Sequence, residues 1–332
     1  MHILVTGGAG YIGSHLVRAL VDQGHAVTVV DDLSSGHRET LPAGVELQLG
    51  DCGDATTLDA AAADHGFDAV MHMAAKCSVE ESVRDPRLYY RTNLGCSLDL
   101  MDWMVARAIP CLVHSSTCAV YGCPDTATID EKVCAEPANP YGASKLAVDL
   151  AMQAYESAYP IRTIALRYFN AAGAHPDGSL GEDKTPASNL VPILFDAALG
   201  LRDRVSVFGT DYPTPDGTGV RDYIHVMDLA AAHIAALEHL AAGKRGGVYN
   251  LGTGTGHSVL EMIDLAREVT GASIPSELVG RRPGDPARLV ADPTRAAAEL
   301  GWRTSVDITA ILSDAWRWRA AHPGGYATEE AR

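Results

Sequence analysis

The segment Val5-Thr6-Gly7-Gly8-Ala9-Gly10-Tyr11-Ile12-Gly13 separates an apolar run, His2 to Thr6, from an amphipathic stretch, Ile12 to Gln23. We predict a strand before the glycines and a helix after them. Gly7, Gly10 and Gly13 let the backbone turn tightly, approach a pyrophosphate closely, and pack the helix against the strand. The free N–H groups at the start of the helix then face the phosphates. A glycine trio also occurs in purely structural turns, so the residues that follow decide its meaning.

Acidic residues follow the next two predicted strands. The second strand, Ala26 to Asp31, ends in an acid that can accept a hydrogen bond from an adenosine ribose and would repel a 2′-phosphate. Asp51 follows the third strand, Val45 to Leu49, and suits a contact to adenine. The glycine turn and these two acids together predict a binding site for NAD rather than NADP.

Short apolar runs alternate with amphipathic stretches through the first half of the chain. Such alternation is typical of a parallel sheet covered by helices on both faces, a Rossmann-type, doubly wound α/β fold. The further strands are predicted at Asp68 to His72, Cys111 to Ser115, Ile161 to Arg167 and Val248 to Leu251. The further helices are predicted at Tyr141 to Ala158, Leu190 to Leu199, Asp228 to Leu240 and Ser258 to Thr270.

The pattern loosens after Asn170, which suggests a second lobe. We expect residues 1–170 to form the NAD-binding domain and 220–251 to return to it. We expect 171–219 and 252–326 to form a smaller C-terminal substrate-binding lobe, and the final residues, 327–332, to be frayed. The glycine cluster Gly252 to Gly256 is interpreted as a turn, because no strand–helix–strand unit follows it.

Composition excludes several classes of protein. The net charge of −16 argues against a nucleic-acid binder, which needs clustered Lys and Arg. No apolar run approaches the roughly 20 residues needed to cross a bilayer, and the N-terminus does not resemble a signal peptide. The seven cysteines are irregularly spaced, so we expect reduced thiols, no structural metal and a cytoplasmic enzyme.

Three residues suggest redox chemistry at a hydroxyl group. Tyr141 and Lys145 are four residues apart in a predicted helix and so share one face. Thr117 follows the predicted strand at Cys111 to Ser115, on the edge of a parallel sheet that faces the ligand crevice. Tyrosine ionises near pH 10, but the Lys145 ammonium and the positive nicotinamide both favour the phenolate. Tyr141 is therefore the expected base, Thr117 the hydrogen-bond partner of the substrate hydroxyl, and Lys145 a ligand of the nicotinamide ribose.

Several longer strings narrow the assignment. Thr6 to Gly13, Ser115 to Gly122, Tyr141 to Lys145 and Arg167 to Asn170 resemble the extended short-chain dehydrogenases. Arg167 to Pro176 (RYFNAAGAHP), Phe208 to Pro213 (FGTDYP) and Asp216 to Asp228 (DGTGVRDYIHVMD) resemble the UDP-glucose 4-epimerase family within them. The resemblance implies tightly held NAD, a UDP-sugar substrate, and a 4-keto intermediate that turns over before hydride returns to its other face.

The resemblance also implies site residues. Those that would contact NAD are Gly7, Gly10, Tyr11, Ile12, Gly13, Asp31, Asp32, Asp51, Cys52, Met73, Ala74, Ala75, Asn93, Tyr141, Lys145, Tyr168 and Phe169. Those that would contact the UDP-sugar are Thr117, Asn170, Asn189, Leu190, Ser206, Val207, Phe208, Arg221, Arg282, Asp285 and Leu289. Among them, Arg221 and Arg282 would hold the diphosphate, because a guanidinium fork suits phosphate oxygens. A surface ion pair with Asp222 is the alternative for Arg221, and Arg281 is the alternative to Arg282.

The sequence departs from the family pattern at three positions. Threonine stands at Thr117 where serine is common, and the hydroxyl is kept. Many members have lysine where Cys77 aligns, with Lys76 one place earlier, which puts a direct NAD contact from this loop in doubt. At Leu289 a tyrosine excludes N-acetyl sugars and a small residue admits them, so leucine leaves the sugar range open.

The resemblance further implies a homodimer formed through helices. Leu94, Leu98, Met101 and Val105 form an apolar stripe in the helix expected there, although a stripe that faces the protein core gives the same pattern.

Other activities remain as alternatives. The nearest is a 4-epimerase for UDP-N-acetylglucosamine or a UDP-pentose. A nucleotide-sugar dehydratase is disfavoured, because Cys118-Ala119 follow Thr117 where such enzymes place an Asp-Glu pair. A non-catalytic NAD-sensing regulator is disfavoured because Tyr141 and Lys145 are both present.

Overall fold

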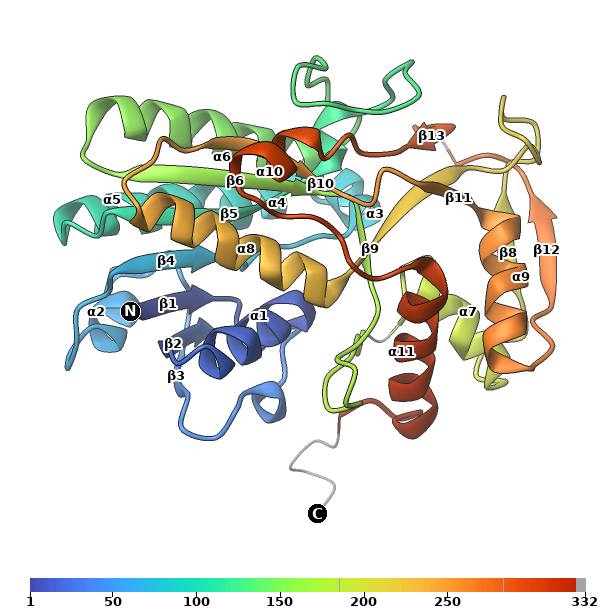
Figure 1. The fold of residues 1–332 in the computed structure, drawn as a ribbon, viewed down its shortest axis with the longest axis horizontal. Coiled ribbons are helices and arrows are strands. Elements are labelled where there is room, and N and C mark those ends of the chain that lie inside the picture. The colour runs from blue at the N-terminus through green and yellow to red at the C-terminus, as the bar shows by residue number, and fades with distance from the viewer. Residues whose placement is uncertain (185, 283, 327–332) are drawn as a thin grey trace.

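A seven-stranded parallel sheet forms the centre of the larger part of the molecule, in the order β10-β6-β5-β4-β1-β2-β3 (Figure 1). It is seen in a computed structural model that describes residues 1–184, 186–282 and 284–326; the end predicted to be frayed, 327–332, lies outside them. The strands are β1 (His2–Thr6), β2 (Ala26–Asp31), β3 (Glu46–Leu49), β4 (Ala69–His72), β5 (Cys111–Thr117), β6 (Arg162–Tyr168) and β10 (Gly247–Leu251). The predicted doubly wound α/β fold is confirmed, with strand ends shifted by at most two residues.

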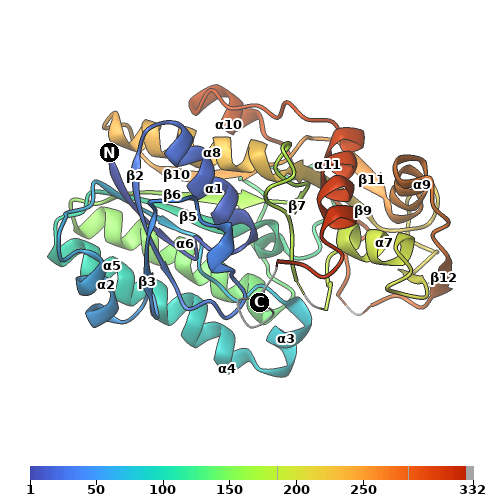
Figure 2. The ribbon, with the colours of Figure 1, turned by 90° about the horizontal axis from the view of Figure 1, so that it is seen from below.

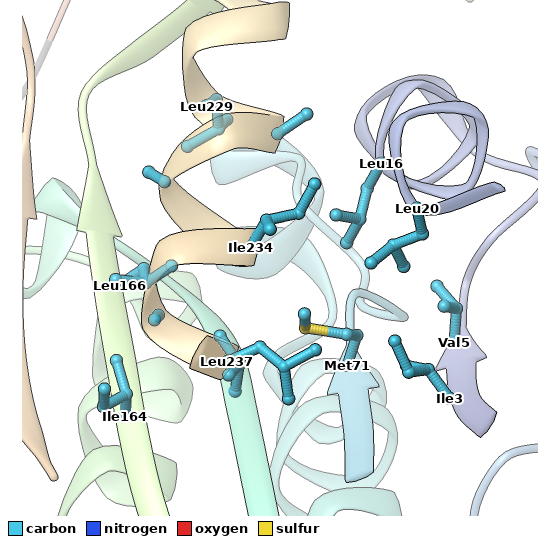
Figure 3. Close-up of a cluster of buried hydrophobic side chains, with 14 of the residues drawn as sticks. Ile3, Val5, Leu16, Leu20, Met71, Ile164, Leu166, Leu229, Ile234 and Leu237 are labelled. Carbon is cyan, nitrogen blue, oxygen red and sulfur yellow. The ribbon is translucent and has the colours of Figure 1, made fainter. Parts of the chain in front are cut away.

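Helices cover both faces of this sheet (Figure 2). On one face α1 (Tyr11–Asp22) and α8 (Val226–Ala241) bury an apolar cluster against β1, β4, β5 and β6 (Figure 3). On the other face lie α2 (Ala55–Ala61), α5 (Cys96–Ala106) and α6 (Pro140–Ala158), which bury a second cluster around Leu4, Val70 and Leu112. Because both faces are covered, the strands are continuous apolar runs rather than alternating ones.

Short elements connect the core. They are the 3-10 turns η1 (Arg38–Thr40) and η3 (Cys118–Tyr121), the helices α3 (Val79–Arg84) and α4 (Pro86–Tyr89), the π-helical segment η2 (Tyr90–Gly95) and α10 (Thr294–Glu299). The carboxyl ends of the core strands point toward the smaller lobe (Figure 1).

The smaller lobe contains two small sheets and three helices. One sheet joins β7 (Asn170–Ala172), β9 (Val220–His225), β11 (Gly256–Ser258) and β13 (Arg288–Leu289); the other joins β8 (Val205–Phe208) and β12 (Ser276–Val279). The helices are α7 (Leu190–Ala198), α9 (Val259–Thr270) and α11 (Ile308–Ala321), which pack on a third apolar cluster. Within 220–251, α8 and β10 join the larger core, whereas β9 pairs in the smaller lobe.

The predicted apolar stripe, which runs from η2 into α5, faces inward for part of its length. Met101 is fully buried, and Leu94 and Leu98 pack against the core cluster beneath α5. These contacts favour the core interpretation of the stripe. In the described part of the chain no helix is both long and apolar enough to cross a membrane. Those same residues hold no group of three or more His, Cys, Asp or Glu arranged for a metal ion.

Candidate active site

The glycine turn between β1 and α1 is tightly packed at Gly7 and Gly13 and open to a ligand at Gly10. Gly7 has φ 70°, and a Cβ there would lie 2.5 Å from the Ala74 nitrogen. A Cβ on Gly13 would lie 2.1 Å from the Gly7 carbonyl oxygen. At Gly10 the nearest atom to such a Cβ is the Gly7 oxygen at 3.4 Å, so this residue faces open space at the N-terminus of α1. The turn therefore offers backbone N–H groups to a phosphate, as a dinucleotide requires.

Asp31 is buried at the end of β2 beside this turn. Its carboxylate accepts hydrogen bonds from the backbone nitrogens of Ala9 and Leu33, both at 2.9 Å. Burial raises the pKa of Asp31, and the two N–H donors oppose that rise. A buried acid that already orders the turn leaves no place for a 2′-phosphate, which fits NAD. Asp32 and Asp51 are exposed near the ends of β2 and β3, and Cys52 is buried.

Asn93, in η2, fixes the loop that follows β4. Its side chain accepts from the Lys76 nitrogen at 2.9 Å and donates to the Lys76 oxygen at 3.0 Å and to Ser144 Oγ at 3.1 Å. This holds Met73, Ala74 and Ala75, all partly buried, next to the glycine turn. The Lys76 ammonium lies 3.4 Å from Ser34 Oγ, and Cys77 is exposed.

Helix α6 begins where it can deliver Tyr141 to Thr117. Asn139 caps the helix by accepting from the Gly142 nitrogen at 2.9 Å, and Pro140 occupies the first turn, where its missing N–H costs nothing. A Cβ on Gly142 would lie 2.4 Å from the Ala119 oxygen, so glycine permits this close packing. Thr117 is among the groups that act on the Tyr141 phenol, and its hydroxyl accepts from the Ala119 nitrogen at 3.1 Å. The predicted pair is brought together at the carboxyl edge of the sheet.

Lys145 lies one turn further along α6 and is buried. Its ammonium donates to the Ser115 carbonyl oxygen in β5 at 2.8 Å. Burial lowers the pKa of Lys145 to about 8, and the nearby Asp149 carboxylate acts in the opposite direction. Tyr141, Thr117 and Lys145 therefore converge as the sequence predicted.

Burial works against the phenolate that we expect at Tyr141. Burial raises the pKa of Tyr141 well above its usual value, Tyr168 and Cys77 add to the rise, and Thr117 opposes it. The Lys145 ammonium donates to a backbone oxygen, and our prediction that its positive charge lowers the Tyr141 pKa stays a prediction. The positively charged nicotinamide is the second group that we predict to favour the phenolate.

A buried ion pair beneath these residues was missed by sequence reasoning. Asp149 accepts from Arg167 Nε at 2.9 Å and from Ser116 Oγ at 3.1 Å, and both charged groups are almost inaccessible. Arg167 also donates to the Tyr121 hydroxyl at 3.0 Å. The signal was present in the sequence, since Asp149 lies four residues after Lys145 on the same helix.

The smaller lobe places Arg282 rather than Arg281 against Phe208, one of the residues predicted to contact the UDP-sugar. The Arg282 guanidinium lies 3.6 Å from the centre of the Phe208 ring. Arg281 is turned away and pairs with the exposed Asp211 at 2.6 Å. In β8, Ser206 and Phe208 are partly exposed while Val207 is fully buried, so only the backbone of Val207 can meet a ligand.

Arg221 and Asp285, both predicted to bind substrate, form an ion pair with each other. The alternative pairing of Arg221 with Asp222 is wrong, because alternate residues of β9 face opposite ways. Asp222 is fully buried and accepts from Thr253, Gly254 and Ala291. It thereby holds the Gly252–Gly256 turn, which confirms the turn, and also the strand that carries Leu289.

The remaining predicted residues surround the same region. Leu289 pairs with Arg221 in register and packs in a small apolar cluster with Cys118 and Phe169. Asn170 donates to the Asp222 carbonyl oxygen at 2.9 Å. Near the glycine turn, Tyr11 donates to the Gly173 oxygen and Ile12 packs into the core. In the smaller lobe, Asn189 donates to Glu182 and Leu190 is the first residue of α7. Tyr168 is the last residue of β6.

Residues 3–252 match the model of the NAD dependent epimerase/dehydratase family. The chain belongs to this family. A curated member from Halalkalibacterium halodurans, a UDP-glucose 4-epimerase, is 46% identical over 330 residues, which cover 99% of this chain and 98% of that one. A solved UDP-glucose 4-epimerase structure matches with a TM-score of 0.96 at 43% identity, covering 99% and 100% of the two chains. The enzyme from Bifidobacterium longum, solved with NAD+ and UDP, matches at 0.93 and 38%, covering 98% and 100%.

Proposed function

We propose that this protein is an NAD-dependent UDP-glucose 4-epimerase that interconverts UDP-glucose and UDP-galactose. The observation that carries the proposal is the convergence of Thr117, Tyr141 and Lys145 at the sheet edge, between the glycine turn and the lobe that bears Arg221 and Arg282. Curated relatives that are 46% and 45% identical over almost the whole chain are UDP-glucose 4-epimerases, and a solved structure of such an enzyme contains NAD+ and UDP.

The proposed chemistry assigns one task to each group. Tyr141 accepts the proton of the sugar C4 hydroxyl and later returns it, while the Thr117 hydroxyl holds the phenol and that hydroxyl in line. Lys145 binds the cofactor ribose and contributes positive charge to the site. When bound, NAD supplies a reversible hydride acceptor, so the same cofactor serves every turnover. Arg282 and Arg221 hold the diphosphate. To do so, Arg221 leaves its ion pair with Asp285 and binds phosphate oxygens instead. Asp285 then accepts a hydrogen bond from a ribose hydroxyl.

The domain roles follow from this assignment. The seven-stranded core holds NAD, and the smaller lobe built on β7, β8, β9 and β13 holds the UDP-sugar.

The sugar range is proposed to include both hexoses, with Leu289 as the residue that limits it. Leu289 is almost buried beside Cys118 and Phe169, close to the strand end that carries Thr117. Activity on UDP-N-acetylglucosamine or a UDP-pentose remains the second candidate.

The test is to incubate purified protein separately with UDP-galactose, UDP-N-acetylgalactosamine and UDP-arabinose, adding no NAD. Formation of UDP-glucose as the fastest reaction supports the proposal and indicates that cofactor is retained. Faster conversion of either other substrate would favour the second candidate. Background rates with all three, in protein that carries NAD, would favour a non-catalytic regulator.

We also propose that the enzyme is a homodimer and works in the cytoplasm. Val83, Tyr90 and Leu150 are exposed apolar side chains on α3, η2 and α6, which pack together on one side of the core. All seven cysteines are free, as in a reducing compartment. Light scattering should give the mass of a dimer, and Leu150→Glu should shift it toward the monomer; a monomeric wild-type protein would refute the dimer.

A further inference from the structure

Two of the seven cysteines meet in space although they are far apart in the sequence. Cys52 lies in the loop between β3 and α2, and Cys96 is the first residue of α5. Both side chains join the same apolar cluster, and the residue after Cys52 lies against Cys96. The neighbouring Cys96, together with burial, raises the pKa of the Cys52 thiol. The two sulfurs therefore form a pair rather than two isolated thiols.

Gly53 allows this approach. A Cβ on Gly53 would lie 2.9 Å from both the Cα and the Cβ of Cys96, and 3.1 Å from its sulfur. Any larger residue at this position would push the loop away from the start of α5. The loop is otherwise well fixed, because Asp51 accepts from the Gly53 nitrogen at 2.8 Å and Asp54 caps α2.

The two thiols differ in access. Cys52 is buried, whereas Cys96 is partly exposed, and its sulfur has only a long contact of 3.7 Å to the Arg91 oxygen. Cys96 also follows directly on η2, the π-helical segment that carries Asn93. Such segments often occur at functional sites. An attacking reagent can thus reach Cys96 first, with Cys52 held behind it.

We propose that Cys52 and Cys96 form a redox-sensitive dithiol that small-molecule disulfides close into an intramolecular disulfide. This inference rests on the proposed function in one respect: Asp51, next to Cys52, is assigned to the adenine end of NAD. Closing the disulfide ties the 50–54 loop to α5. If that loop must move to release adenine, the closed form releases NAD more slowly.

The chemistry balances with an oxidant of the glutathione disulfide class. The Cys96 thiolate attacks one sulfur of the oxidant, forms a mixed disulfide and displaces one glutathione thiolate. The Cys52 thiol then loses its proton to solvent, attacks the Cys96 sulfur and displaces the second glutathione thiolate. Two protein thiols are oxidised to one disulfide, and one small disulfide is reduced to two thiols. Closure brings the two sulfurs to a bond of about 2.05 Å.

The test uses NAD-loaded protein treated with oxidised glutathione, alkylated, digested with trypsin and analysed by mass spectrometry without reduction. Cleavage places Cys52 in peptide 39–76, Cys96 in 92–107 and the exposed Cys77 in a third peptide, 77–84. We expect a cross-link between 39–76 and 92–107, lighter by two hydrogen atoms than the two peptides together and removed by dithiothreitol. Gly53→Ala, which pushes the pair apart, should greatly reduce it, and Cys96→Ser should abolish it.

The second measurement follows exchange of bound NAD for labelled NAD. Exchange should be several-fold slower in oxidised wild-type protein, reversed by dithiothreitol, and unaffected by oxidant in Cys96→Ser. Glutathione attached to Cys96 without the cross-link would overturn the dithiol proposal. A cross-link with unchanged NAD exchange would overturn its coupling to the cofactor. The cross-link is read without any epimerase assay, so its failure and the failure of the proposed function are distinguishable.

Discussion

Replacing Asp149 with asparagine should move the alkaline limit of activity to lower pH. Asp149 lies one helical turn after Lys145, is fully buried, and is the main group that raises the pKa of that lysine. Burial lowers the Lys145 pKa, and with both effects acting this pKa is about 8. The ammonium is present below this pKa and is lost as the pH rises through it. Without the Asp149 carboxylate the ammonium loses its proton at a lower pH.

The expected size follows from Coulomb's law. Side chains four residues apart on a helix are about 6 Å apart, and at an effective dielectric constant of about 20 two unit charges then interact by roughly 2–3 kcal/mol. This corresponds to about 1–2 pKa units. At pH 7.5 the charged fraction of Lys145 falls from about three quarters to roughly one tenth for a shift in the middle of that range. We therefore expect kcat/KM at pH 7.5 to fall several-fold and the descending limb of its pH profile to move from near 8 to near 6.5.

The assay must separate this effect from damage to the fold. Asp149→Asn leaves the Arg167 guanidinium buried without its partner, which costs roughly 3–5 kcal/mol and lowers Tm by about 10 °C. The double variant Asp149→Asn/Arg167→Met removes that unpaired charge, so it should recover stability but keep the shifted pH profile. Ser116→Ala removes one hydrogen bond to Asp149 without changing its charge and should leave the profile near 8. A profile in Asp149→Asn identical to that of wild type would refute the reasoning.

Three further predictions concern selectivity, substrate binding and acid stability. Leu289→Tyr should reduce the ratio of kcat/KM for UDP-N-acetylgalactosamine to that for UDP-galactose by about tenfold or more, because the pocket beside Cys118 shrinks; an unchanged ratio would remove Leu289 from the sugar site. Arg282→Ala should raise KM for UDP-galactose about tenfold or more, through loss of a charge-assisted contact, while Arg281→Ala should change it little; equal effects would contradict the assignment. Burial lowers the pKa of His72 to about 3 and of His233 to about 4, so the unfolded chain takes up protons first as the pH falls below 6.5. Each histidine should then cost about 2 kcal/mol of stability at pH 5, seen as a falling urea midpoint; a midpoint constant from pH 7 to pH 5 would contradict this.

The sequence predicted the core elements well because their signals are local. The run from Val27 to Val30 ends at Asp31, and the glycine turn precedes a helix with a regular apolar face, so both the elements and their order follow from short-range patterns. The end of β5 was predicted too short, because Ser116 and Thr117 are polar. Ser116 donates to Asp149, which is distant in the sequence, and Thr117 caps η3, the 3-10 turn that follows it directly.

The site was predictable as a set of residues but not as a set of interactions. Helical spacing put Tyr141 and Lys145 on one face, yet it did not reveal that the lysine is held by the Ser115 carbonyl oxygen. Arg221 and Asp285 were both assigned to substrate, and only the folded lobe shows that they pair with each other. The choice of Arg282 over Arg281 depended in the same way on which side chain lies over Phe208.

The central claim, transient oxidation at C4 with return of the same hydride, is tested most directly by following a label. UDP-galactose deuterated at C4 is converted by purified protein in ordinary water, and the product UDP-glucose is analysed by mass spectrometry and NMR. The account predicts that deuterium stays at C4 in the product and that Tyr141→Phe slows the conversion by about 10²-fold or more. Loss of the label to solvent during conversion would contradict the account, because it would mean that the C4 hydrogen leaves as a proton rather than as a hydride.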